Sequence, residues 1–392
     1  MRRKAARTPA ERVRFFTESV IREMTRLAQV HGAINLAQGL PDLETPQELK
    51  DAACRAIQEG HNQYAVTWGA PVLRQAIAEK ARRFNGIDCD PDANVTVCCG
   101  ATECMMATML GLVDPGDEVI LFEPFYENYG PDGLVSGARP VLVALEPPSW
   151  SFDREELRRA FGPRTRAIIV NTPNNPTGKV FSREELGFIA ELCCEHDVLA
   201  FTDEIYEHII YTTEPHVSLA TLPGMAERTV TISGLSKTFS VTGWRLGYVV
   251  APAALTDAIR KVHDFLTVGA AHPLQIAGAA ALALPDSYYA DLRAGYARRR
   301  DILVPYLRET GFRFAGPEGA YYVMTDIGDF GFASDLDFVH MMLRELGVAA
   351  VPGSSFYSRP ERGRSKVRFM FAKNDATLRE AGERLRKLKR RR

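Results

Sequence analysis

The sequence predicts an α/β protein, with a large domain built on a mainly parallel sheet sandwiched by helices and a smaller α+β domain. One observation is the alternation, from about residue 94 onwards, of short β-rich runs with longer helical stretches. The other is a change past about residue 285, to an Arg-rich helix, the segment EGAYYVMTDI, a further helix and the alternating strand KVRFMFA. We therefore expect residues 45–285 to form the large domain, and both chain ends, residues 1–44 and 286–392, to form the small one.

Composition and charge indicate a globular protein that binds neither nucleic acid nor a membrane surface. The chain has 392 residues, 46% of them hydrophobic, which is enough to bury a large core without disulfide bonds or a structural metal. Its formal net charge of −1 argues against binding to nucleic acid or to a membrane surface. Both ends are basic, at residues 1–12 and 384–392, and we interpret them as frayed tails and solvated helix faces.

The cysteines and histidines predict a reduced protein without a metal. The seven cysteines show no CxxC spacing, and two pairs are direct neighbours, at 98–99 and 193–194. The first residues lack the apolar core of a secretory signal, and no stretch approaches the length of a transmembrane helix. We therefore expect a cytoplasmic protein with mostly buried thiols. The histidines form no HExxH or other tight ligand pattern, so we expect no metal site.

The expected strands of the large domain end in polar side chains. The β-rich runs are NVTVCC, DEVILFEPFY, TRAIIVN, DVLAFTD and RTVTISG, which begin at residues 94, 117, 165, 197 and 228. A helix after the third run is marked by Ser182 and Glu185, which form a capping box. The carboxyl ends of parallel strands share one edge of a sheet, and open α/β sheets bind their ligands at that edge. We therefore expect a ligand site there.

The turn Gly100-Ala101-Thr102 opens a helix directly after the first of these strands. The first amide groups of a helix have no partner within it, and together with the helix dipole they form an anion site. Glycine lets a phosphate approach the backbone closely. Many such turns carry glycine only to reverse the chain, so the turn by itself does not establish a phosphate site.

Asp203 ends an apolar strand, and its carboxylate therefore needs a cationic or hydrogen-bonding partner. The protonated nitrogen of a pyridine ring would be such a partner, and the pairing would keep the ring an electron sink. Tyr206 could present its hydroxyl to the same ligand. A helix N-cap for Asp203 and a tyrosine packed on the sheet edge are the alternatives, and the sequence leaves them open.

Two further residues follow strands in the same way. Asn175 lies in NTPNNPTG, where the prolines and the glycine make a rigid loop that could aim an amide at a ring oxygen, although any tight loop uses these residues. Tyr126 could lie flat over a heteroaromatic cofactor or be an ordinary core aromatic.

Lys237 lies in SGLSKTFSVTGWRLG, a stretch with few other charges. A P-loop is excluded, because GxxxxGK[ST] needs glycines where this chain has Thr231 and Ser236. What remains is an amine of lowered pKa in a confined site, suited to a Schiff base and to proton transfer. Arg245 then offers a charge-assisted fork for a phosphate, with an ordinary salt bridge as the alternative.

The order of these motifs resembles a known family. Gly100-Ala101-Thr102, NTPNNPTG, TDEIY and SGLSKTFSVTGWRLG occur here as they do in the class I/II aminotransferases, which are pyridoxal-phosphate enzymes of fold type I. The resemblance runs from about residue 34 to 372. NTPNNPTGKVF and NQYAVTWGAPVLR look most like the branch of kynurenine and glutamine-type aminotransferases. The family resemblance implies a seven-stranded central sheet and a homodimer with active sites at the interface.

The resemblance also implies roles around pyridoxal 5'-phosphate. Lys237 would form the internal aldimine and move a proton between substrate and cofactor, and Asp203 would pair with the pyridinium nitrogen. Asn175 and Tyr206 would hold the ring oxygen, and Tyr126 would stack on the ring. The phosphate would be bound by Gly100, Ala101, Thr102, Ser236 and Arg245, with Tyr64 from the neighbouring subunit.

The substrate carboxylate is assigned to Arg368, which matches the arginine that grips it by a bidentate pair, with Asn175 and Gly39 beside it. Alternation in KVRFMFA supports this, because Val367 and Phe369 would face the core and Arg368 the opposite side. An exposed strand arginine is the alternative. The family often carries serine three residues before the lysine, where this chain has Gly234, so it stays open whether Ser233 or Ser236 contacts the phosphate.

The predicted activity is a ping-pong transamination from an L-amino acid to a 2-oxo acid through the Lys237 aldimine. The alternative is a pyridoxal-phosphate C–S β-lyase or a specialised biosynthetic enzyme, which would use Lys237 and Asp203 in the same way. A ligand-sensing domain would require an attached helix-turn-helix module, for which the α/β pattern leaves no room. Aromatic, sulfur-containing and neutral polar amino acids all remain open as substrates.

Overall fold

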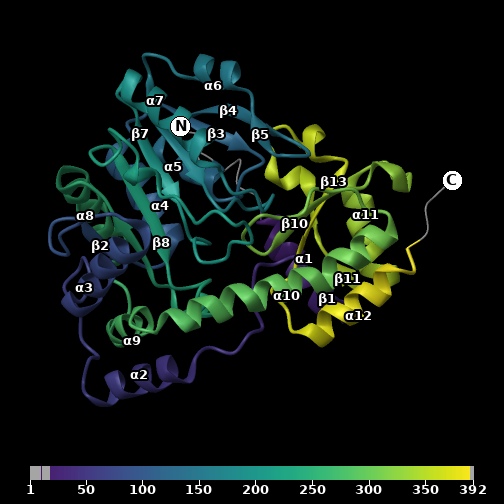
Figure 1. Ribbon diagram of the computed structural model, residues 1–392, viewed down its shortest axis with the longest axis horizontal. Helices are drawn as coiled ribbons and strands as arrows, with labels where there is room; N and C mark the ends of the chain where they lie inside the picture. The colour runs from purple at the N-terminus through teal and green to yellow at the C-terminus, as the bar shows by residue number, and fades with distance from the viewer. Residues whose placement is uncertain (1–9, 11–17, 389–392) are drawn as a thin grey trace, which may run out of the picture.

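The computed structural model describes residue 10 and residues 18–388. The prediction of frayed basic tails therefore falls in part on residues 1–9, 11–17 and 389–392, which lie outside the described residues. The described chain has a large sheet with helices on both faces, and a smaller sheet with its own helices beside it (Figure 1).

The large sheet has eight strands and is mainly parallel, as predicted. In spatial order they are β2 (Val95–Cys98), β9 (Gly247–Val250), β8 (Thr229–Gly234), β7 (Leu199–Asp203), β6 (Thr165–Asn171), β3 (Glu118–Glu123), β4 (Arg139–Glu146) and β5 (Ser151–Phe152). Neighbours from β8 to β4 are parallel, whereas β9 is antiparallel to both β2 and β8. The two-residue β5 is antiparallel to β4 and adds an edge strand to the seven that were expected.

Both faces of this sheet are buried, because successive side chains of a strand point to opposite faces. In β6, Ile168 and Val170 belong to one core cluster, and Ala167 and Ile169 belong to the other. This explains the continuous apolar runs in the sequence. The helices and helical turns of this part are α2 (Gln47–Gln58), α3 (Pro71–Lys80), α4 (Ala101–Leu112), α5 (Tyr129–Ser136), α6 (Arg154–Ala160), α7 (Arg183–His196), α8 (Ala253–Thr267) and α9 (His272–Leu282), with short turns at Ala81–Asn85, Leu219–Thr221 and Thr242–Trp244.

Local signals predicted several of these boundaries correctly. Ser182 caps α7, its hydroxyl accepting a hydrogen bond from the backbone of Glu185, whose side chain reaches back to the Ser182 backbone. Gly100 precedes α4 with φ of 85°, a conformation that favours glycine, and no side chain caps this helix. The first amides of α4 are therefore open to an outside anion.

The smaller part joins segments from both chain ends. Its three-stranded sheet has the order β10 (Tyr322–Asp326), β13 (Lys366–Met370) and β12 (Val351–Pro352), and β1 (Ile34–Asn35) pairs in parallel with β11 (Val348–Ala349). The 25-residue α10 passes from the large sheet to the small one (Figure 1). The other helices are α1 (Val20–Val30), α11 (Asp335–Met341) and α12 (Asp375–Leu385), with short turns at Gly328–Phe330, Met342–Leu346, Gly353–Phe356 and Pro360–Gly363. The domain boundaries at residues 44/45 and 285/286 stay a prediction.

Strand β13 was expected to have one face on the core and Arg368 on the opposite face, but the structure buries both faces. Val367, Arg368 and Phe369 all have 0% exposure, so both faces of the strand are covered. The alternative of an exposed strand arginine is therefore wrong. A guanidinium is buried only when it is paired, so Arg368 must have partners inside the protein.

Candidate active site

A cavity of about 420 Å³ lies at the carboxyl-end edge of the large sheet. All the predicted site residues line it except two, Gly100 and Tyr64; those present are Gly39, Ala101, Thr102, Tyr126, Asn175, Asp203, Tyr206, Ser236, Lys237, Arg245 and Arg368. Gly100 directly precedes the lining residue Ala101, whereas Tyr64 is 85% exposed and lies outside this cavity. The fold therefore brings these side chains together at one edge of the sheet, as expected.

Arg245 reaches this edge although it precedes a strand. Because β9 runs antiparallel to β8, the start of β9 at Gly247 pairs with the end of β8 at Gly234. Arg245 has φ of 55°, which places it in the left-handed region just before β9. The loop from Lys237 to Arg245 therefore begins and ends at the same edge of the sheet.

Lys237 is enclosed by the site. Its Nζ donates a hydrogen bond to the backbone oxygen of Gly39 at 3.2 Å and lies 5.9 Å from the ring centre of Tyr206. Burial and the neighbouring positive charge of Arg245 lower the pKa of Lys237 to about 8, against the opposing effect of Asp203. A larger share of this amine than of a surface lysine is therefore unprotonated near neutral pH, as a nucleophile requires.

Asp203 is held from two sides. Its Oδ2 accepts a hydrogen bond from the Tyr129 hydroxyl at 2.7 Å, and its Oδ1 accepts one from the backbone N–H of Ile205 at 3.2 Å. Burial raises the pKa of Asp203, and the Tyr129 hydrogen bond works against this rise. Among the described residues, no side chain forms an ion pair with Asp203. A cationic ligand in the cavity would therefore stabilise its charged form.

The expected phosphate site is tightly built. A Cβ on Gly100 would come within 2.4 Å of Nη2 of Arg245, so the guanidinium packs directly on the glycine. A Cβ on Gly247 would lie 2.3 Å from the carbonyl carbon of Gly100. The guanidinium donates one hydrogen bond, to the backbone oxygen of Thr242 at 3.1 Å, which leaves other N–H groups for a ligand. Arg245 and the open start of α4 thus meet at one place.

The two serines that could contact the phosphate, Ser233 and Ser236, lie in different surroundings. The Ser233 hydroxyl donates to Glu207 Oε1 at 2.6 Å, and Ser233 is buried away from the cavity. Ser236 lines the cavity. A side chain at Gly234 has no space, since its Cβ would lie 2.7 Å from the backbone oxygen of Leu246. Ser236 is therefore the serine placed for a ligand.

Arg368 joins the two sheets at the cavity. Its Nη1 donates to Oδ1 of Asn175 at 2.6 Å and its Nη2 to the backbone oxygen of Ala37 at 2.5 Å, while Nε has no hydrogen-bond partner among the described residues. The guanidinium lies over the rings of Tyr322 and Phe356, at 4.3 and 4.8 Å from their centres. These bonds use two of its N–H donors, so others remain for a carboxylate.

Sequence reasoning missed several residues of the site. Tyr129 contacts Asp203, and the Tyr322 hydroxyl lies 2.9 Å from that of Tyr206. Asp132 lines the cavity at 2% exposure, and its Oδ2 has no hydrogen-bond partner in the part of the chain that the structure describes. Burial together with Asp203 raises the pKa of Asp132 to about 8. Tyr129 follows Tyr126 by three residues, a helical spacing that could have indicated it. Asp132 follows Tyr129 by three residues in α5, so the same spacing could have indicated it.

Residues 31–385 match the family model described as aminotransferase class I and II. The chain belongs to this family. The resemblance inferred from its motifs is therefore confirmed, and the chain is a transaminase.

Named relatives agree along nearly the whole chain. The probable N-succinyldiaminopimelate aminotransferase DapC of Mycobacterium tuberculosis is 42% identical, over 95% of this chain and 97% of its own. The methionine aminotransferase of Escherichia coli is 38% identical, over 94% and 96%, and kynurenine–oxoglutarate transaminase 1 of Homo sapiens is 38% identical, over 94% and 95%. A solved structure of the Mycobacterium tuberculosis N-succinyldiaminopimelate aminotransferase superposes with a TM-score of 0.94, over 97% of this chain and all of that one. The expected fold and the kynurenine-type branch are thus both supported.

Proposed function

We propose that this aminotransferase works with pyridoxal 5'-phosphate attached to Lys237, in two half-reactions in which the first oxo acid leaves before the second enters. The observation that carries the proposal is the single cavity that joins a lysine of lowered pKa with Asp203 on one side and with Arg245 and Arg368 on others. Asp203 would pair with the ring nitrogen of the cofactor, Arg245 with its phosphate, and Arg368 with the carboxylate of the substrate.

The residues present fit the cofactor. The open amides of Ala101 and Thr102 and the guanidinium of Arg245 form a cradle for its phosphate, which a Cβ on Gly100 would fill. Ser236 adds a hydroxyl to this cradle. Asp203, buried without an ion-pair partner among the described side chains, suits the ring nitrogen. Asn175 and Tyr206 suit the ring oxygen, and Tyr126 the ring face.

The cofactor, when bound, supplies an electron sink that lowers the energy of the carbanion formed when the α-proton leaves. Asp203 keeps the ring nitrogen protonated. With the substrate amine bound to the cofactor, the freed Nζ of Lys237 would take the α-proton and pass it to the cofactor within the same half-reaction, and it would move a proton the opposite way in the second, a role worth about a hundred- to ten-thousandfold. The Tyr206 hydroxyl, backed by Tyr322, fixes the ring oxygen at the edge of the site.

Arg368 is assigned to the substrate α-carboxylate, with Gly39 close by. A Cβ on Gly39 would collide with the Tyr322 hydroxyl at 2.0 Å, so a side chain there would narrow the cavity. Elsewhere on the lining, Arg22 and Glu127 bring opposite charges, and Glu127 accepts a hydrogen bond from the Ser19 hydroxyl at 2.5 Å. Balanced charges of this kind suit an uncharged substrate side chain, and we propose aromatic, sulfur-containing or neutral polar amino acids.

A β-lyase would use the same lysine and aspartate. The relatives named above are all aminotransferases, so this alternative is not favoured.

A homodimer is part of the proposal. Tyr64 lies outside its own chain's cavity, among exposed apolar side chains on residues 62–70 and at the end of α8. The most exposed of these are Phe265 at 92% and Tyr64 at 85%. A second copy that covers this patch would receive the Tyr64 hydroxyl in its own phosphate site, as the family resemblance implies. An exposed apolar patch of this kind is typical of an interface.

A reducing cytoplasm is the compartment we propose. All seven cysteines are free, and Cys89, Cys98, Cys104 and Cys193 are buried. Disulfides are rare in that compartment. Within residues 18–388, no helix has the length and apolar character needed to cross a membrane.

The proposal is tested by adding pyridoxal phosphate to purified apo-protein. We expect a visible absorbance band and, after borohydride reduction, a modified peptide that contains Lys237. A panel of amino acids with a 2-oxo acid should then yield a new amino acid from donors with uncharged side chains. Colourless protein without a modified peptide would refute the cofactor assignment, and pyruvate and ammonia from β-substituted donors alone would favour the lyase.

For the dimer, chains that carry Tyr64→Ala and chains that carry Lys237→Ala are mixed. Each hybrid has one complete site, because the chain with Lys237 receives an intact Tyr64 from its neighbour. Activity that does not rise on mixing would contradict the shared site.

A further inference from the structure

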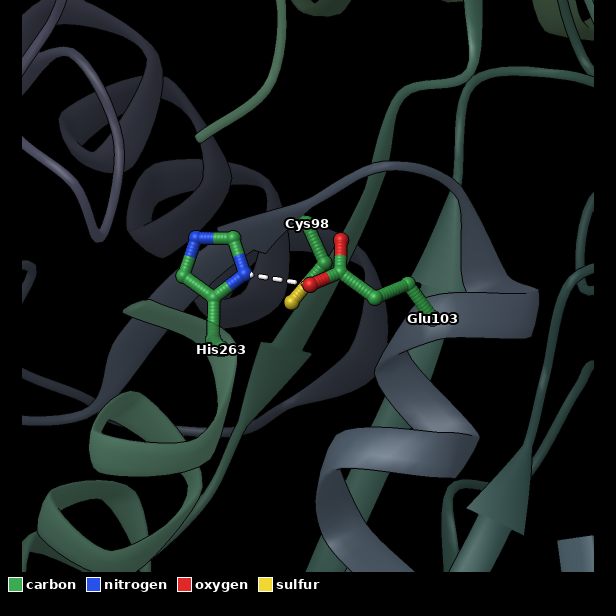
Figure 2. Close-up of side chains that lie close together, drawn as sticks. All are labelled: Cys98, Glu103 and His263. Carbon is green, nitrogen blue, oxygen red and sulfur yellow. Dashed lines mark hydrogen bonds and ion pairs between the residues drawn. The ribbon is translucent and has the colours of Figure 1, made fainter. Parts of the chain in front are cut away.

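Three side chains with metal-ligand atoms meet next to the turn Gly100-Ala101-Thr102, which we call the phosphate turn. Figure 2 shows Cys98 of β2, Glu103 of α4 and His263 of α8, with the imidazole facing the carboxylate. All three are buried. Nδ1 of His263 lies 2.6 Å from Oε1 of Glu103. The expectation drawn from histidine spacing did not foresee this cluster, because its members are far apart in the chain.

Hydrogen bonds extend from the His263 ring in two directions. Its Nε2 lies 2.8 Å from the backbone oxygen of Thr67, and its Nδ1 faces Glu103. Since both partners are acceptors, both ring nitrogens carry protons and the ring is an imidazolium. Burial acts to lower the pKa of His263, whereas its contacts with Cys98 and with the Glu103 carboxylate act to raise it, and the net shift is upward.

Glu103 connects this ring to the phosphate turn. Its Oε2 accepts a hydrogen bond from the backbone N–H of Cys99, and its Oε1 accepts one from the Thr267 hydroxyl at 2.9 Å. Glu103 is the third residue of α4, so its negative charge lies within the first turn of the helix that would bind the phosphate. Left unpaired, that charge would repel the phosphate dianion.

We propose that His263 is a positioning residue for the cofactor phosphate. Its imidazolium neutralises Glu103 and fastens the first turn of α4 to Thr67, in the segment 62–70 that also carries Tyr64. One ring thus braces the phosphate turn of its own site and the segment that would reach the neighbouring site. This inference rests on the proposed function.

A divalent metal is the competing occupant of the cluster. It would have to replace the bond between Glu103 and His263, because Nδ1 and Oε1 already face each other at 2.6 Å. It would also need the thiolate of Cys98, whereas contact with Cys104 and burial raise the pKa of this thiol well above its usual value. The hydrogen-bonded ion pair is therefore favoured, and metal content enters the test.

The test compares the affinity of apo-protein for pyridoxal phosphate with that for pyridoxal, which lacks the phosphate. Variants are His263→Asn and the double variant His263→Asn/Glu103→Gln. Thr256→Val is the control, since Thr256 is a buried residue of α8 whose hydroxyl donates to Ala251 and not to the phosphate turn. Zinc is measured in every preparation by mass spectrometry.

In His263→Asn we expect pyridoxal phosphate to bind about tenfold or more weakly, with the affinity for pyridoxal unchanged. The double variant should regain part of the lost affinity, because the repelling carboxylate is gone although the tie to Thr67 stays broken. If His263→Asn does not fold, Glu103→Gln alone decides: glutamine keeps an oxygen that accepts from Nδ1 of His263 but carries no charge, so it should bind pyridoxal phosphate at least as tightly as the natural protein.

Four results would overturn the inference. These are equal weakening for both aldehydes, a double variant weaker than the single one, weaker binding by Glu103→Gln, and stoichiometric zinc whose removal reproduces the His263→Asn loss. Natural protein that binds neither aldehyde would refute the proposed function as well, whereas the four results leave that function intact.

Discussion

Nη1 of Arg368 donates a 2.6 Å hydrogen bond to Oδ1 of Asn175, and this bond joins the smaller sheet to the loop after β6 of the large one. The residue assigned to the substrate and a residue assigned to the cofactor ring are thus in direct contact. Movement of the smaller sheet relative to the large one would therefore displace the side chains assigned to the substrate carboxylate and to the cofactor ring. This contact gives the first prediction its direction.

Arg368→Lys keeps the positive charge but loses the planar fork. We expect KM for amino acid donors to rise by about ten- to a hundredfold, since a charge-assisted hydrogen bond contributes about 1.5–3 kcal/mol. Because the substitution also disturbs the hydrogen bond to Asn175, the visible spectrum of the bound cofactor should shift slightly. Arg344→Lys, at an exposed position, is the matched control. An unchanged KM would remove Arg368 from the carboxylate site.

Lys237→Ala removes the amine that we place on the cofactor. Transamination should fall by at least about a hundredfold, the lower range for general acid-base catalysis. Borohydride reduction followed by peptide mass spectrometry should find no modified lysine. Lys261→Ala, which breaks an exposed ion pair with Asp257, should leave both results as in the natural protein. A reduced adduct on another lysine would contradict the assignment.

Ser236→Ala and Ser233→Ala should have different effects. The first removes a hydroxyl from the cavity, so affinity for pyridoxal phosphate should fall while the free energy of unfolding changes little. The second removes one of the hydrogen bonds that the buried Glu207 accepts, beside its contacts with Lys80 and Asn85, and should lower the free energy of unfolding by about 1–3 kcal/mol. Titration with cofactor and denaturant unfolding separate the two. A reversed outcome would place Ser233 at the phosphate.

Gly247→Ala should damage the phosphate turn without touching a ligand directly. The new Cβ would meet Gly100 at 2.3 Å and Ala101 at 2.4 Å, both backbone atoms that cannot turn aside. We expect weaker cofactor binding and lower stability, measured by titration and by thermal unfolding. Gly187→Ala in α7 meets nothing within 4 Å and should raise stability by up to about 1 kcal/mol. Equal behaviour of the two variants would argue against this close packing.

A buried ion pair predicts pH-dependent stability. Nζ of Lys80 lies 2.6 Å from Oε1 of Glu207, and both side chains are 3% exposed. Burial by itself raises the pKa of Glu207, but the pKa is lowered to about 2, and the charge of Lys80 is the largest cause that opposes burial. Because this pKa lies below its ordinary value of 4.5, Glu207 contributes stability above about pH 4.5, and this is lost as pH falls towards 2.

Lys80→Met should therefore lower the free energy of unfolding at pH 7 by about 3–5 kcal/mol, as expected when one partner of a buried pair is removed. The difference from the natural protein should shrink as pH falls from 4.5 towards 2. Denaturant unfolding at several pH values measures it. Lys261→Met, at an exposed pair, should cost less than about 1 kcal/mol. A deficit that stays constant with pH would show that Glu207 does not carry the effect.

Local patterns in the sequence predicted the elements that depend on near neighbours. The strand that ends at Asp203 and the capping box of Ser182 and Glu185 are examples. So is the glycine turn before α4. Their physical causes act over two to four residues, through alternation of side chains, capping and backbone conformation. The order of such motifs along the chain was enough to identify the family.

The sequence by itself therefore determined the kind of fold and the family, and it predicted Lys237 as the reacting lysine. The tertiary structure alone decided that β9 runs antiparallel and so returns Arg245 to the edge where Lys237 lies. It also decided that Tyr129 holds Asp203, 74 residues away, and that Arg368 binds the backbone of Ala37, 331 residues away. Such pairings depend on how whole elements pack, and residues this far apart leave no periodic trace in the sequence.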